Sequence, residues 1–490
     1  MEIQVRQGDW LFLLMCFGLG LLGELSFFHG GIGVSYLVFI AGFYLVLFLR
    51  FRFAFHHRRI GLLLMAAIWI LAGSYLFHDS ALFYQLNLLA IPVLVFFHIV
   101  LITSPNQLNW SKPQFILLLI EKMREGLQYV SSFGKFSLKK VFTNMSDQTA
   151  KTIKHILFGL VIGVPLLLII TGLLMSADAV FQDVILRLPQ FFLQLHFMEG
   201  IFRIALVIFF GFLFFGIFQV LNRNTKAEEQ HGQAKRNIHW DSVISITILV
   251  MLNAMYVLFA VIQFTYFFND GLQDGYTYAE YARRGFFELL FVTVINWSLL
   301  ICFLKFTSDE RIGIKLTLKI LYSLLISLSG VILVSAYQRL SMYQAAYGFT
   351  VDRILADGFM IFLMVIFAYT FIRVWIERLS LLHFYLIAGL AFYTVLNAVH
   401  IEQIIVDNNL ERYEETGKID IHYLNSLSYT GLDGLMELYE KEPDYPELEG
   451  MLQNRQMQQE HSDSEQKAWP SFNFTIEAVT EKLKDLDLEK

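Results

Sequence analysis

Apolar stretches of about twenty residues recur along the first 400 residues of this chain, and short polar or glycine-containing segments separate them. An α-helix rising 1.5 Å per residue needs about 20 residues to cross a hydrocarbon core of about 30 Å. Hydropathy and helix breakers together predict eleven spans: 10–28, 32–49, 60–77, 81–104, 155–176, 200–221, 241–267, 285–306, 316–337, 354–373 and 380–399. The pattern therefore predicts an all-α fold, a polytopic transmembrane helix bundle with a small helical C-terminal extramembrane domain.

The polar segments between the spans divide the chain into four regions. Residues 1–104 are expected to form an N-terminal four-span membrane region, and residues 105–154 a cytoplasmic basic loop whose stretch 114–130 is amphipathic and suited to a membrane surface. Residues 155–399 are expected to form a seven-span membrane core. Residues 400–490 are expected to form an acidic, mostly helical extracytoplasmic tail.

Composition supports a membrane protein and offers little chemistry. The chain is 56% hydrophobic and 16% charged, whereas about a quarter of the residues of a soluble domain are charged. The two cysteines, Cys16 and Cys302, lie inside apolar stretches, so we expect no disulfide framework and no metal site. The sequence holds no phosphate-binding loop, zinc-protease, nucleophile or nucleic-acid motif. We expect no cofactor and no nucleic-acid partner, and the absence of a catalytic motif argues against an enzyme.

The distribution of Lys and Arg predicts the orientation of the bundle. Loops on the N-terminal side of the predicted bundle hold 22 of these residues and the opposite loops hold 5. Short cytoplasmic loops carry an excess of positive charge, so the N-terminus is predicted to be cytoplasmic. With eleven spans the tail then lies outside. The tail holds 21 acidic and 8 basic residues, a net charge of −13, whereas residues 1–399 carry +7.

Within the tail, helical spacing of apolar residues predicts several helices. The first covers 401–413, with Gly417 as its C-terminal cap, and Asp420 is placed to cap the next one. A third helix is expected around 432–439 and a last one after Trp469. The Gln- and Glu-rich stretch 447–467 is predicted to be mobile.

Five stretches carry a family resemblance: Leu174–Phe181, Gly275–Leu290, Ser335–Arg353, Asn409–Ser428 and Trp469–Asn473. Together they resemble the bacterial polytopic membrane family catalogued as domain of unknown function 4153/4173. The resemblance covers roughly residues 155–475 and finds nothing to match in the first four spans. It implies a multi-pass protein of the bacterial inner (plasma) membrane, and it implies no activity or functional residues.

The predicted outer side gathers most of these stretches, and four arginines there depart from the positive-inside pattern. Glu280 and Arg284, and likewise Arg284 and Glu288, are spaced i,i+4 and can pair along one helix face. We therefore treat six residues as a candidate outer-face polar cluster over which the acidic tail docks: Glu280, Arg283, Arg284, Glu288, Arg339 and Arg353. The alternative is that the arginines only anchor helix ends at the lipid headgroups.

Two amides, Asn253 and Asn296, fall near the middle of neighbouring predicted spans and are the candidate mid-membrane polar residues. They can face one polar pocket, or they can be interhelical hydrogen-bond partners worth about 0.6–2 kcal/mol each. Two functions stay open at this point. The outward gathering of distinctive sequence favours a sensory, assembly or binding protein, whose partners are the lipid bilayer and a protein at the extracytoplasmic face. The alternative is a transporter or channel-like protein for a small solute, ion or lipid.

Overall fold

The computed structural model describes residues 7–52, 55–112, 114–143, 197–221, 240–268, 286–307, 311–466 and 468–488, with single positions between 152 and 175. These residues form sixteen α-helices and one short 3-10 helix, and they include no β-strand. Ten of the helices are long and apolar enough to cross a membrane. The prediction of an all-α, multi-pass bundle is confirmed.

The ten candidate spans coincide with ten of the eleven predicted ones. They are α1 (Gln7–Phe27), α2 (Val34–Phe51), α3 (Arg58–Phe77), α4 (Ala81–Thr103), α8 (Phe197–Leu221), α9 (Ser242–Phe268), α11 (Phe286–Phe306), α12 (Ile312–Tyr347), α13 (Val351–Trp375) and α14 (Leu381–Ala398). The eleventh prediction, 155–176, lies mostly outside the described residues.

The chain folds into two compact units, which we describe separately. The first comprises Met1–Leu62, Leu94–Lys226 and Glu465–Phe472, and the second comprises Leu63–Val93, Ala227–Ser464 and Asn473–Lys490. The division does not follow chain order, because the hairpin of α3 and α4 and the C-terminal tail are both shared between the units. The four consecutive regions expected from the sequence stay a prediction.

In the first unit, α1 packs against α8 along most of its length, and α2 packs beside α1. Small residues allow this close approach, since a Cβ on Gly20 would lie 2.6 Å from the carbonyl oxygen of Val207. Backbones approach this closely in membranes where a residue lacks a side chain, because dispersion contacts drive helix association there. Phenylalanines fill the space around the crossing, including Phe12, Phe215 and Phe218.

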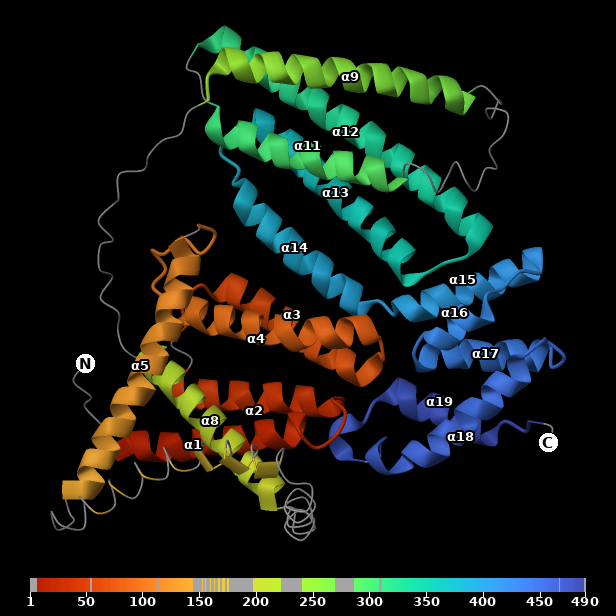
Figure 1. Cartoon of the computed structure of the whole chain (residues 1–490). Helices are drawn as coiled ribbons and strands as arrows, with labels where there is room; N and C mark the ends of the chain where they lie inside the picture. The colour runs from red at the N-terminus through yellow and green to blue at the C-terminus, as the bar shows by residue number, and fades with distance from the viewer. Residues whose placement is uncertain are drawn as a thin grey trace. The chain divides into compact units, whose positions relative to one another are not determined.

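The amphipathic stretch predicted at 114–130 is confirmed as a helix and is longer, since α5 runs over Gln114–Thr143. It is not among the candidate spans. In Figure 1 it runs at a steep angle to α1 and α2, and it packs against α8.

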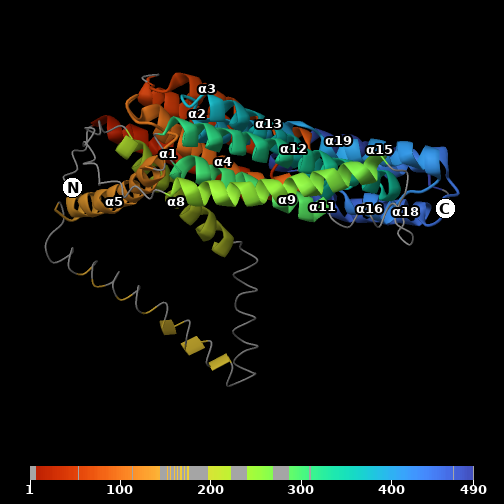
Figure 2. The same ribbon diagram turned by 90° about the horizontal axis from the view of Figure 1, so that it is seen from above.

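In the second unit, α9, α11, α12 and α13 run side by side (Figures 1 and 2) and enclose a buried apolar core. The central helix, α12, has 36 residues where the hydropathy pattern predicts 22. At 1.5 Å per residue it is about 54 Å long, well beyond a hydrocarbon core of about 30 Å. The helix therefore continues past the apolar layer, and it ends at Gly348, whose φ of +84° leaves the helical region.

Five helices follow α14 and form the tail domain: α15 (Ile401–Thr416), α16 (Ile421–Ser426), α17 (Tyr429–Lys441), α18 (Leu448–Gln466) and α19 (Phe474–Asp485). The predicted caps are confirmed. Gly417 ends α15 with a φ of +65°, and the Asp420 carboxylate accepts a hydrogen bond from the backbone N–H of Tyr423 at the start of α16.

The prediction that 447–467 is mobile is wrong, because α18 occupies that stretch. Leu448 and Leu452, four residues apart, are fully buried in the apolar core of the tail domain. The Gln456 side-chain amide donates to the backbone carbonyls of Leu483 and Leu486. A few apolar residues at helical spacing are thus enough to order a polar segment once a partner helix supplies the core.

Candidate functional site

The most elaborate polar site in the second unit lies where the α3–α4 loop meets the tail domain. We call it the junction cluster: His78, Asp79, His400, Glu402 and Thr430. These residues are placed by the end of α3, by the start of α15 and by the first turn of α17. None of the five lies inside a candidate span, so the cluster sits at a span end.

Asp79 caps α17, although it precedes that helix by 350 residues. Its Oδ2 accepts from the backbone N–H groups of Tyr429 at 2.5 Å and Thr430 at 3.3 Å, and its Oδ1 accepts from the Thr430 hydroxyl at 3.0 Å. The residue in the ordinary cap position, Ser428, makes no such bond. Unpaired N–H groups and the helix dipole both favour a carboxylate there. The first turn of this tail helix is therefore completed by the α3–α4 loop.

Two histidines stack beside this cap. The rings of His78 and His400 lie 4.7 Å apart at 18°. His400 Nε2 is 3.1 Å from the hydroxyl oxygen of Thr430. Because that hydroxyl gives its proton to Asp79, His400 must donate from Nε2, which fixes its tautomer. Burial lowers the pKa of both rings below the usual 6.5, and the neighbouring ring lowers that of His78 further; nearby Asp79 partly opposes both shifts.

Glu402 lies on α15 and is 4% exposed. Its Oε2 accepts from the Ser428 hydroxyl, and Ser80 also bonds it. Burial raises the pKa of this carboxyl above its usual range, and the nearby Asp79 carboxylate adds to the shift. A group with a raised pKa stabilises the folded state below its ordinary pKa and loses that contribution as the pH rises. Glu402 thus responds to pH in the sense opposite to the two histidines.

A small cavity of about 20 Å³ opens between the junction cluster and the ends of the spans. Its wall includes Ser74, His78, Asn397, His400 and Glu402. This is the size of a single water molecule, and a buried water needs two to four polar partners of this kind. The cavity therefore suits one water or a species of similar size, and it is too small for an organic substrate.

Below the cavity a second polar layer joins α4 to α14. Asn87, fully buried, donates to Asn397 Oδ1 at 2.6 Å and to the Ser74 hydroxyl at 3.1 Å, and it accepts from the Tyr393 hydroxyl at 2.6 Å. Each polar atom of the Asn87 side chain thus has a partner. Within an apolar layer such a saturated set fixes one helix register, because any other leaves polar groups unpaired.

The tail domain has a second attachment, at the turn between α12 and α13. Asn409 Oδ1 accepts from the backbone N–H of Phe349, and Asn409 Nδ2 donates to its carbonyl, both at 2.9 Å. The Arg412 guanidinium donates to the carbonyls of Ala345 and Ala346 at 2.9 and 2.6 Å. These are among the last carbonyls of α12, where a cation complements the helix dipole. Docking of the tail thus uses an amide and a tail cation.

The pentapeptide Trp469–Asn473, which is part of the family resemblance, makes a different pair of contacts. In the first unit the backbone N–H groups of Gly33 and Val34 donate to the carbonyls of Pro470 and Phe472 at 2.7 and 2.9 Å. In the second unit Asn473 Nδ2 donates to the carbonyls of Tyr75 and His78 at 2.9 and 2.8 Å. Asn473 also caps α19 by accepting from the N–H of Ile476. The segment therefore bonds to the ends of two spans.

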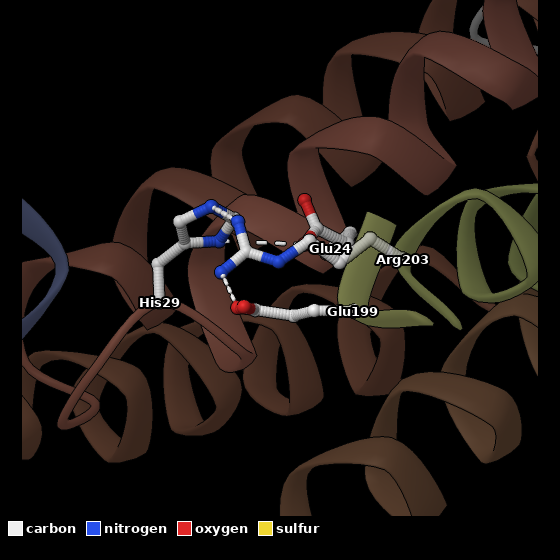
Figure 3. Close-up of polar contacts among 4 residues, drawn as sticks. All are labelled: Glu24, His29, Glu199 and Arg203. Atoms are coloured by element: carbon white, nitrogen blue, oxygen red, sulfur yellow. Dashed lines mark hydrogen bonds and ion pairs between the residues drawn. The ribbon is translucent and has the colours of Figure 1, made fainter. Parts of the chain in front are cut away.

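The first unit contains its own ionic site, shown in Figure 3. Glu24, only 3% exposed, lies 3.7 Å from Arg203 Nε and 3.4 Å from His29 Nδ1. Arg203 also contacts His29 Nε2 and pairs with Glu199 one turn earlier on α8. Because the guanidinium only donates, His29 meets it with the lone pair of Nε2, and His29 Nδ1 faces Glu24. A buried carboxylate needs an opposite charge nearby, and Arg203 supplies that charge.

The opposite ends of α1, α2 and α8 are joined by another polar set. Arg50 bonds to Asp9 at 3.2 Å and to the side-chain oxygen of Gln219 at 2.9 Å, and its guanidinium lies 4.5 Å from the centre of the Phe12 ring. Charged groups thus join α1 to α8 at both ends, and Arg50 joins the end of α2 to them. α8 therefore runs in the direction opposite to α1.

The residues proposed from the sequence fall in several places. Glu280, Arg283 and Arg284 lie outside the described residues, and Glu288 is exposed in the first turn of α11. Arg339 is buried within α12. Arg353 contacts the carbonyl of Gly348 and lies 4.2 Å from the centre of the Tyr343 ring. The outer-face polar cluster stays a prediction.

The two mid-membrane amides bond between helices. Asn296, on α11, donates to the Ser329 hydroxyl at 3.0 Å and accepts from the Tyr256 hydroxyl at 2.7 Å. Asn253, on α9, donates to the carbonyl of Leu321 on α12 at 3.1 Å. Both amides are buried, at 1% and 3% exposure. They connect α9, α11 and α12, and no group of residues fit to hold a metal ion occurs in the described part of the chain.

Sequence reasoning missed the junction cluster, because its members are spread over 350 residues and none belongs to a known motif. A signal was available for Asp79 alone, since an acidic residue in a three-residue link between two spans must lie at a membrane surface.

Comparison with known proteins agrees with the resemblance over residues 155–438 and extends it toward the N-terminus. The family model described as domain of unknown function (DUF4153) matches residues 65–438, about three quarters of the chain. The chain belongs to this family. The DUF4153 match starts within α3, so the expectation that the first four spans hold nothing to match is wrong. The match includes His78 and Asp79, which the sequence resemblance had left out, and it ends before the stretch Trp469–Asn473. No curated protein and no solved structure matches the chain.

Proposed function

We propose that this protein is a sensory or assembly protein that binds a partner outside the cytoplasm through its tail domain. One observation carries the proposal: Asp79 of the α3–α4 loop completes the first turn of α17. A tail domain that folded independently of the spans would supply the caps of its own helices. Here any partner that shifts α17 acts directly on the link between two spans.

Topology supports the side on which this binding would occur. In the first unit, the N-terminal end of α8 lies at the end of α1, through Arg203 and Glu24. The end of α4 lies at the α2–α3 link instead, where the backbone N–H of His56 donates to the carbonyl of Ile102. The start of α8 and the end of α4 therefore lie on opposite sides of the membrane if each candidate helix crosses it. The predicted span 155–176 would supply this change of side between α4 and α8.

The same reasoning supports an outer position for the tail. Its contacts are with Gly33, one crossing after the N-terminus, and with His78 and Asp79, three crossings after it. Both numbers are odd, so the tail lies on the side opposite the N-terminus, whatever the total count. With the positive-inside bias, the N-terminus is cytoplasmic and the tail is outside.

Cysteine labelling in intact cells tests this orientation. Glu440, exposed on α17, and Lys112, exposed beside α5, are matched positions on the two predicted sides. A membrane-impermeant maleimide should label Glu440→Cys in intact cells and Lys112→Cys only after permeabilisation. Labelling of Lys112→Cys in intact cells would reverse the orientation and remove the extracytoplasmic partner.

Co-purification in mild detergent tests the binding function. We expect a stoichiometric protein partner with the wild-type chain, and its loss with Asp79→Ala, while a matched variant of the exposed Asp444 retains it. The transporter alternative draws on the buried amides between α9, α11 and α12. It predicts the reverse pattern, in which Asn296→Leu abolishes function and Asp79→Ala leaves it intact.

A further inference from the structure

α5 presents three distinct faces along its length, and within the described residues one of them packs against other helices. The packed face meets α8, where Gly126 lies against Ile217 and the Phe133 ring lies 4.9 Å from that of Phe215. A second contact joins α5 to α1, because the rings of Phe133 and Trp10 are 5.7 Å apart. This face is fully used in holding the first unit together.

A second face of α5 is apolar and exposed. Ile116, Ile120, Met123 and Leu127 recur at i, i+4, i+7 and i+11 and share one face of the helix. Ile120 is 63% exposed and Leu127 is 56% exposed. We call these four residues the α5 apolar stripe. A run of large aliphatic side chains facing water is unfavourable, at about 25 cal/mol for each Å² left exposed.

A third face of α5 is polar. Glu121, Arg124, Gln128 and Lys135 are exposed and lie on the side of the helix that follows the stripe. A helix that packs on one side, and divides its free surface into an apolar and a polar half, has the pattern of a helix lying in a membrane interface.

The position of α5 sets its depth. Its contacts are with Trp10, in the first turns of α1, and with the part of α8 that precedes Gln219. These are the ends of two candidate spans, so α5 lies at the level where the apolar layer begins. Figure 1 shows α5 at a steep angle to α1, as an in-plane helix would be. The neighbouring part of α1 exposes Leu11 and Leu14, each 66% exposed, as a lipid-facing helix does.

We propose that α5 lies in the plane of the leaflet on the N-terminal side, with its apolar stripe against lipid acyl chains and its polar face toward water. The occupant of the stripe is lipid, because the adjoining span surface is also lipid-facing. This anchor does not depend on the tail or on a partner outside the cytoplasm.

Spin labels on the full-length chain in lipid nanodiscs test the proposal. Cys302→Ala leaves Cys16, which is fully buried, as the sole native cysteine. Labels are then placed at Leu127→Cys on the stripe and Gln128→Cys on the polar face. Neighbouring positions on one helix differ only in direction, so each is a control for the other.

For each label we measure the rate of collision with oxygen and the rate of collision with a water-soluble nickel complex. We expect the ratio of the first rate to the second to be several-fold higher at position 127 than at position 128. A water-like ratio at both positions would show that the stripe faces solvent and would overturn the proposal. An immobile label at 127, shielded from both reagents, would show a second copy or a protein partner on the stripe and would also overturn it.

Discussion

Replacing Asp79 by alanine should detach the first turn of α17 without altering any residue of the tail domain. The change removes three hydrogen bonds that end on a carboxylate. Loss of a helix N-cap costs about 0.5–2 kcal/mol, and a hydrogen bond to a charged group is worth about 1.5–3 kcal/mol. These contributions overlap, because all three bonds share one carboxylate. We therefore expect opening at the junction to become easier by about 2–4 kcal/mol.

At 1.4 kcal/mol per factor of ten, this change raises the open population by roughly 30- to 700-fold. Hydrogen–deuterium exchange of the α17 amides in the detergent-solubilised full chain measures it, because exchange reports local opening. In Asp79→Asn the α17 amides should exchange at a rate between those of the wild type and Asp79→Ala, because asparagine is also a good N-cap but lacks the charge. Asp444→Ala, an exposed acidic residue in the same domain, is the control and should leave exchange unchanged.

The reasoning fails if α17 exchanges at the wild-type rate in Asp79→Ala. It also fails if all amides of the tail domain accelerate equally in Asp444→Ala, because the effect would then follow from net charge and not from the cap.

Three further outcomes follow from other parts of the second unit. Gly348→Ala should destabilise the α12–α13 turn by about 1 kcal/mol or more, because φ is +84° and a Cβ would lie 2.5 Å from the tail amide oxygen; faster exchange of residues 345–351 would show it. Asn296→Leu should lower the free energy of unfolding by about 1–3 kcal/mol, because it leaves the hydroxyls of Tyr256 and Ser329 without their partner. Thermal denaturation in detergent measures this change, and an unchanged midpoint would argue against the network. His78 and His400 have lowered pKa values, so their stabilisation is present above pH 6.5 and is lost as the pH falls; α17 protection, corrected for intrinsic exchange, should weaken from pH 7 toward pH 5. Glu402 opposes this trend, because its raised pKa strengthens the closed state at low pH. In the His78→Gln, His400→Gln double variant the protection should therefore no longer weaken toward pH 5, and weakening that persists would show that the rings are not its cause.

The spans could be predicted from sequence because hydropathy is a local property of about twenty residues. The same holds for the two helix caps: Gly417 favours the left-handed backbone that ends a helix, and the short acceptor side chain of Asp420 favours a helix start. The length of α12 could not be predicted, since its last turns are polar and are held by contacts from Arg412 of the tail.

The junction cluster could not be predicted for a related reason. His78 and His400 are ordinary loop residues until folding brings their rings together. The helix α18 was also missed, because Leu448 and Leu452 count as apolar faces only when a core exists to receive them. The tail docks at the α12–α13 turn through Asn409 and Arg412, two polar residues that no motif distinguishes. The outer-face polar cluster stays a prediction.

The binding claim is tested most directly by photocrosslinking in living cells. A photoreactive amino acid placed at exposed positions of the tail domain, such as Glu440, should capture one discrete protein from outside the cytoplasm, and the capture should weaken in the Asp79→Ala background. The same residue at Lys112, on the opposite side, should not capture that protein. Equal capture at Lys112, or no adduct at any exposed position of the tail domain, would contradict the account.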